Sequence, residues 1–129
     1  MLILMAPAVA FLTVRMVDRD DAGDGNGRSP ASTQAGLCAT LGAATDEDLA
    51  GARTIFPDRS HDGLHQLAAH ATEVDPTAAA ELLRTKQRVE ALLDGTPQPA
   101  ELTTALRHLA DATAQAAEAV GETDVKGCG

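Results

Sequence analysis

From residue 60 onward, apolar residues recur at three- and four-residue steps, the spacing that places them on one face of an α-helix. Three long stretches share this spacing, and each predicts an amphipathic helix. Their stripes comprise Leu64, Leu67, Ala68, Ala71 and Val74 in the first, Ala79, Leu82, Lys86, Val89 and Leu93 in the second, and Leu102, Ala105, Leu109, Ala112, Ala116 and Ala119 in the third. Because the last stripe changes from Leu to Ala, its C-terminal half is expected to approach a neighbour closely.

Helix start and stop signals bound these stretches. Ser60 is placed to cap the first helix, and the Asp-Pro pair at 75–76 joins an N-cap to a proline at the first helical position, where its missing N–H is not needed. The second helix is expected to end at Gly95. The segment at 96–99 then begins a third helix, which stops at Gly121.

Two shorter helices are predicted before residue 60. The first runs from about Thr33 to Ala43, and the second begins with Thr45 as its N-cap and stops before Pro57. Because the turns between the later helices are short, the fold class is all-α: a small antiparallel helical bundle of three main helices, with the two short N-terminal helices closing its open side.

The N-terminal part has a different character. Residues 1–17 begin with an apolar run to Val14, which at about 1.5 Å per residue is short for a membrane span and is typical of a signal peptide or a short signal anchor. A core helix is the alternative interpretation. Residues 18–32 are charged and rich in Gly, Ser and Asp, which predicts a disordered linker. The helical bundle domain then covers residues 33–129.

The net charge of the chain limits the classes of molecule that are expected to bind it. The chain carries a formal charge of −9 and has no Trp or Tyr, so a nucleic-acid partner is not expected. Two pairs of opposite charge, Glu81–Arg84 and Lys86–Glu90, have the spacing of neighbours near the surface of the second main helix. Membrane contact is expected only through the N-terminal segment.

The two cysteines, Cys38 and Cys128, lie near opposite ends of the predicted domain, and the ends of a compact domain are often close in space. A disulfide between them would stabilise the fold by about 4–5 kcal/mol according to loop entropy. It would also place the domain outside the reducing cytoplasm, either secreted or membrane-anchored. The alternative is two free thiols in a cytosolic protein.

His61 and His65 are the residues with the clearest chemical interest. They lie four apart at the start of a predicted helix, so their rings fall on one face and could chelate Zn or Cu, with Asp58 or His108 as a third ligand. The simpler interpretation is helix capping by Ser60, with the two rings forming hydrogen bonds between helices.

Catalytic chemistry is not expected. Ser60, His61 and Asp62 are consecutive, so their side chains diverge and cannot form a nucleophile–base relay. The sequence also contains no phosphate-binding glycine loop and no paired-cysteine redox motif.

The stretch SHDGLHQLAAHATEVDPTAAAELLRTKQRVEALL at 60–93, with a Cys before it and a Cys near the terminus, resembles uncharacterised small secreted or membrane-anchored helical proteins of actinobacteria. The resemblance implies a helical fold and assigns no catalytic residue. The expected function is therefore a non-enzymatic extracytoplasmic binding or accessory protein of the cell envelope, with an unknown protein partner. The alternative is a metal-binding or metal-delivery protein that uses His61 and His65.

Overall fold

The computed structural model describes residues 29–128, and within this range the secondary structure is entirely helical. In chain order the helices are α2 (Pro30–Thr45), α3 (Leu49–Arg59), α4 (His61–Thr72), α5 (Pro76–Asp94) and α6 (Pro99–Ala119). The predicted signal or anchor segment at 1–17 lies outside the described residues, as does most of the predicted linker at 18–32.

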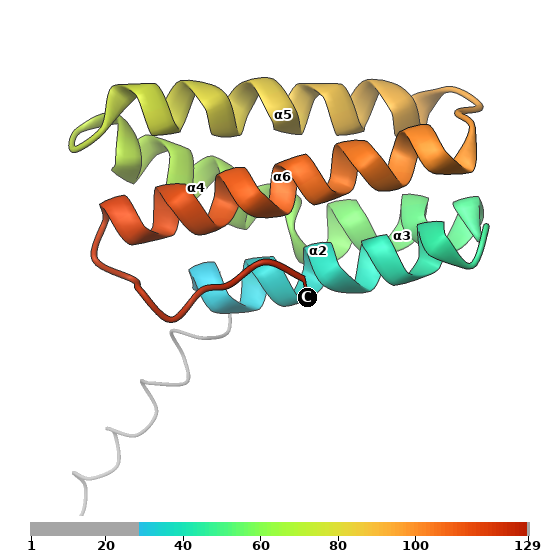
Figure 1. Ribbon diagram of the computed structural model, residues 1–129, viewed down its shortest axis with the longest axis horizontal. Helices are drawn as coiled ribbons and strands as arrows, with labels where there is room; N and C mark the ends of the chain where they lie inside the picture. Colours follow the sequence, from blue (N-terminus) through green and yellow to red (C-terminus); the bar gives the residue numbers. More distant parts are fainter. Residues whose placement is uncertain (1–28, 129) are drawn as a thin grey trace, which may run out of the picture.

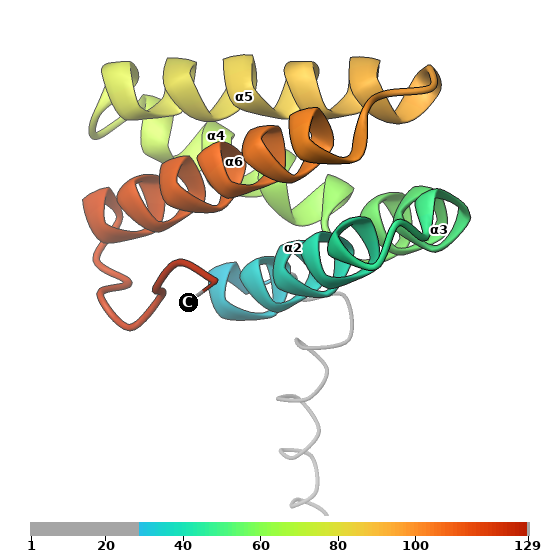
Figure 2. The ribbon, with the colours of Figure 1, turned by 45° about the vertical axis from the view of Figure 1, so that its right-hand side comes forward.

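The helices form a bundle with α6 near its centre. Figure 1 shows α5 and α6 side by side and running in opposite directions, with α4 behind them. In Figure 2, α6 lies between α5 and α2. Helix α4 packs mainly against α5, whereas α2 packs against both α3 and α6. The all-helical fold is thus confirmed, and the opposite directions of α5 and α6 (Figure 1) agree with the predicted antiparallel packing.

The division into three main and two short helices is wrong in one respect. Helix α2 has 16 residues and α4 has 12, so α2 is a full member of the bundle. It begins at Pro30, three residues before the predicted start, because the Ser29 side chain accepts a hydrogen bond from the Ser32 N–H and Pro30 occupies the first turn. This start resembles the Asp-Pro start of α5, where the Asp75 side chain accepts from the Ala78 N–H.

The predicted bounds of the second helix are also corrected. Thr45 ends α2 and donates its hydroxyl to the Leu41 carbonyl, while Asp48 caps α3. Between them Glu47 adopts a left-handed conformation with φ of 60°. Helix α3 continues through Pro57 to Arg59, so the proline, which removes one backbone hydrogen bond, does not end the helix here.

The core consists mainly of leucine and alanine. Its fully buried large side chains are Leu37, Leu64, Leu82, Leu106 and Leu109. In the second half of α6, Ala112, Ala116 and Ala117 are buried, and α6 contacts α2, α4 and α5, which agrees with the predicted close approach. Val74, predicted to be part of the α4 stripe, is 60 % exposed because α4 ends at Thr72.

Ser60 connects two helices rather than capping one through its side chain. It stands at the N-cap position of α4 but makes no side-chain capping bond. Its buried hydroxyl donates instead to the Thr33 carbonyl of α2, at 3.0 Å. A Cβ at Gly36 would lie 2.5 Å from the Ser60 Oγ, so glycine permits this close approach of α2.

The C-terminal tail returns across the bundle to α2 (Figure 1). Cys128 forms a disulfide with Cys38, with the two Cα atoms 5.3 Å apart, and the predicted pairing is confirmed. Val125 is buried, and the Gln34 amide of α2 donates to the Lys126 carbonyl at 2.7 Å. The tail is therefore held by a covalent bond, a hydrogen bond and an apolar contact.

The disulfide indicates an oxidising compartment. No helix within residues 29–128 combines the length and apolar character needed to cross a membrane.

Candidate functional site

The His61 and His65 rings lie together at the start of α4. Their centroids are 4.7 Å apart and the rings meet edge to face. The side chain of His61 is 38 % exposed, and His65 is also exposed, so solvent reaches both. Two imidazoles at this separation offer two nitrogen donors on one helix face, although metal binding itself stays a prediction.

Glu90 of α5 holds the His61 ring. One oxygen of its carboxylate, Oε2, lies 3.0 Å from His61 Nδ1 and 2.8 Å from Lys86 Nζ. A carboxylate paired with an ammonium group acts only as an acceptor, so His61 Nδ1 is the donor of this hydrogen bond. In a neutral imidazole, the proton at Nδ1 leaves the lone pair of Nε2 free.

The side chain of Lys86 is more buried than the sequence predicts. The sequence predicts the Lys86–Glu90 pair near the surface, and the pair forms, but the side chain of Lys86 is only 5 % exposed. Its position in the apolar stripe of α5 explains the burial. A buried ammonium group needs a partner of opposite charge, and Glu90, itself 32 % exposed, supplies one.

The third metal ligands suggested by the sequence do not join the histidine pair. Asp58 is exposed on α3, and His108 lies on α6 in a separate groove against α5. Among residues 29–128, no group of three or more His, Cys, Asp or Glu side chains is placed to hold a metal ion. The structure thus brings together two of the four residues proposed for a metal site.

A groove of about 510 Å³ opens beside His61, between α3 and α5. It is lined by Arg53, Phe56, Pro57, His61, Glu90, Leu93 and Asp94. Arg53 belongs to the fold, because its guanidinium Nε donates to the Leu93 carbonyl at 2.7 Å and its Nη2 donates to the Gly95 carbonyl, which satisfies the C-terminal end of α5.

A second groove of about 440 Å³ lies between α5 and α6. It is lined by Arg84, Thr85, Arg88, Ala100, Glu101, Thr104, Ala105 and His108. The two guanidinium groups have carboxylate partners, since Arg84 pairs with Glu81 at 2.6 Å and Arg88 lies 3.5 Å from Glu101. Little free positive charge therefore remains in this groove.

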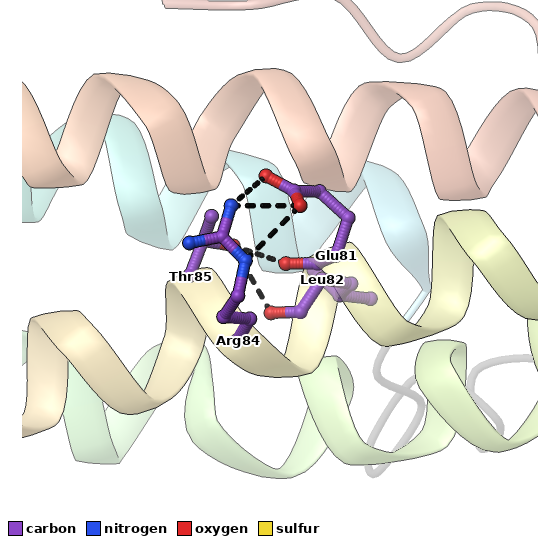
Figure 3. Close-up of polar contacts among 4 residues, drawn as sticks. All are labelled: Glu81, Leu82, Arg84 and Thr85. Carbon is purple, nitrogen blue, oxygen red and sulfur yellow. Dashed lines mark hydrogen bonds and ion pairs between the residues drawn. The ribbon is translucent and has the colours of Figure 1, made fainter.

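Figure 3 shows the Glu81 carboxylate facing the Arg84 guanidinium across one turn of α5. Hydrogen bonding to Glu81, and then its negative charge, raise the pKa of Arg84 above its ordinary value. Thr85, beside them, donates its hydroxyl to the Glu81 and Leu82 carbonyls of its own helix. These groups satisfy one another and do not point to a ligand.

No family model matches the chain, and the comparisons with curated proteins and with solved structures give no match either. Sequence reasoning missed the contact between Glu90 and His61. Lys86 stands within the apolar stripe of α5, and the acidic residue Glu90 follows one turn later. This pattern was the signal in the sequence that a polar contact lies on this face of α5.

Proposed function

We propose that the protein is a non-enzymatic binding or accessory protein of the cell envelope, secreted or held at the membrane by its N-terminal segment. The Cys38–Cys128 disulfide carries this proposal, because such bonds form and persist in oxidising compartments. In a domain of this size, a crosslink between residues 90 positions apart contributes a large share of the net stability. A cytosolic environment would reduce it.

The partner proposed for this domain is another protein. From Cys38 to the C-terminus the chain has 15 acidic and 7 basic residues, a balance that disfavours nucleic acid. The groove beside His61 supports protein binding, because buried Phe56 and Leu93 line it together with the acidic residues Glu90 and Asp94. Such a mixture suits an apolar side chain with a basic neighbour.

Cell fractionation of the full chain in its native cells tests the location. We expect the protein in the envelope or the medium, and a membrane-bound fraction that changes when residues 1–17 are deleted. Recovery of the whole pool with the cytosolic marker proteins would contradict the proposal.

A metal-binding or metal-delivery protein is the second candidate, favoured by the His61–His65 contact and by the Glu90 hydrogen bond that leaves His61 Nε2 free. Titration of the purified protein with Cu(II) and Zn(II) tests it. We expect micromolar binding that disappears when His61→Ala and His65→Ala are combined. Equal binding by the double variant would remove this candidate.

A further inference from the structure

We propose that Glu90 is a positioning residue for a two-nitrogen chelate, in which it fixes His61 Nε2 as the donor atom that acts with His65 on a divalent transition metal ion. The inference rests on the second candidate function and deepens it, because it names the group that prepares the site and the class of ion that the site takes.

The first step concerns the proton on His61. Glu90 Oε2 accepts hydrogen bonds from both His61 Nδ1 and Lys86 Nζ, at 3.0 and 2.8 Å. Because a carboxylate oxygen accepts hydrogen bonds, the proton in this contact is the one on His61 Nδ1, and the lone pair of the neutral ring lies on Nε2. Metal-ligating histidines usually have this arrangement, in which a carboxylate on the second nitrogen orients the ring and increases its basicity.

The second step concerns how firmly the carboxylate is held. Lys86 is nearly buried on α5, and its ammonium group contacts the same Glu90 oxygen that His61 contacts. The ring of His61 is consequently tied to α5 while its backbone belongs to α4. Since α4 and α5 pack against one another, the position of the ring is set before any ion arrives.

The third step concerns the second donor. His65 lies one turn further along α4, with its ring centroid 4.7 Å from that of His61. Imidazole nitrogens suit Cu, Ni and Zn, and the affinity order of divalent ions places Cu(II) first. Two protein donors leave the other coordination positions to water or to groups of a second molecule, which suits an exchangeable ion rather than a structural one.

Isothermal titration of the full-length oxidised protein with Cu(II), and separately with Zn(II), tests the proposal. Glu90→Gln is the test variant. Glu81→Gln is the matched control, because Glu81 is also a paired acid on α5 but contacts Arg84 instead of His61. His70→Ala controls for removal of an α4 histidine outside the pair. We expect Glu90→Gln to weaken Cu(II) binding by about 10- to 100-fold. Both controls should stay within about twofold of the native protein, because neither removes a contact of the pair.

Glu90→Gln leaves Lys86 buried without its counter-charge, so a folding defect has to be separated from a loss of orientation. The combined variant Lys86→Met with Glu90→Gln removes both charges and should show the same loss of affinity in a folded protein. Nitrogen-15 NMR of the metal-free native protein gives a further readout, in which the neutral His61 ring should carry its proton on Nδ1.

These experiments distinguish a failure of the role of Glu90 from a failure of metal binding by His61 and His65. If the double histidine variant loses binding and the folded Lys86→Met, Glu90→Gln variant binds as tightly as the native protein, the role of Glu90 is overturned while metal binding stands. If His61 carries its proton on Nε2, the role of Glu90 is likewise overturned. If the double histidine variant binds as well as the native protein, both the role of Glu90 and the second candidate function fall.

Discussion

Two regions of this small bundle are held together by different kinds of interaction. On one side the C-terminal tail is fastened to α2 by the Cys38–Cys128 disulfide and by the Gln34 hydrogen bond to Lys126. On the other side α4 is tied to α5 through His61 and Glu90, with a buried Lys86 behind them. The stability of the contact between the tail and α2 depends on the redox state of the compartment. The stability of the contact between α4 and α5 depends on each charged group keeping its partner.

The disulfide is expected to have the largest effect on stability. Replacing both cysteines, as Cys38→Ser with Cys128→Ser, should lower the free energy of unfolding by about 4 kcal/mol, because the unfolded chain regains the freedom of a long loop. Urea denaturation of the oxidised native protein and of the double variant measures the difference. An unchanged midpoint would show that the tail contributes little to stability.

The buried ion pair should come next. Glu90→Ala leaves the Lys86 ammonium buried and unpaired, which should lower the free energy of unfolding by about 3 kcal/mol. Glu81→Ala is the matched control on the same helix. Its partner Arg84 is exposed, so the urea midpoint of this control should hardly move. Equal effects of the two variants would contradict the distinction between buried and exposed pairs.

The approach of α2 to the α3–α4 junction can be tested with a pair of glycines. Gly36→Ala should destabilise the fold by about 2 kcal/mol, because the added Cβ would meet the Ser60 Oγ and Arg59 Cβ. Gly42→Ala, on the same helix, meets nothing within 4 Å and should stabilise by about 0.5–1 kcal/mol through helix propensity. Thermal unfolding of both variants checks the opposite signs. Two shifts of the same sign would contradict the close approach at Gly36.

The smallest expected effect lies in the turn between α2 and α3. Glu47→Gly should stabilise by about 0.5 kcal/mol, because glycine adopts the left-handed conformation at φ of 60° without a steric penalty. Glu73→Gly is the control, since Glu73 ends α4 with an ordinary φ of −79° and glycine should destabilise there. A loss of stability at position 47 similar to that at 73 would contradict the strain assigned to Glu47.

Local signals predicted much of the fold. The stripes and end signals of α5 and α6 place these helices to within a residue or two, because Asp75 and Gly95 act on their own backbone neighbours. Helix α2 was misjudged although Ser29 and Pro30 carry the same start signal as α5, because the polar composition before it favoured a linker. Proline was given too much weight as a stop signal at Pro57, since it interrupts a helix by one hydrogen bond and does not always end it.

The candidate site was predictable only in part. The spacing of His61 and His65 places their rings together because both belong to one helix. Glu90 comes from another helix, 29 residues away from His61, and no local pattern reports which face of α5 meets α4. The burial of Lys86 has the same origin, since a lysine within an apolar stripe can either extend to solvent or pair inside, and packing decides between them.

The state of the two cysteines in the native protein tests the central claim most directly. Protein from its native cells is quenched in acid, alkylated with and without prior reduction, digested and weighed by mass spectrometry. We expect a linked peptide pair containing Cys38 and Cys128 and no alkylation before reduction. Complete alkylation of both cysteines without reductant would contradict the disulfide and, with it, the extracytoplasmic location.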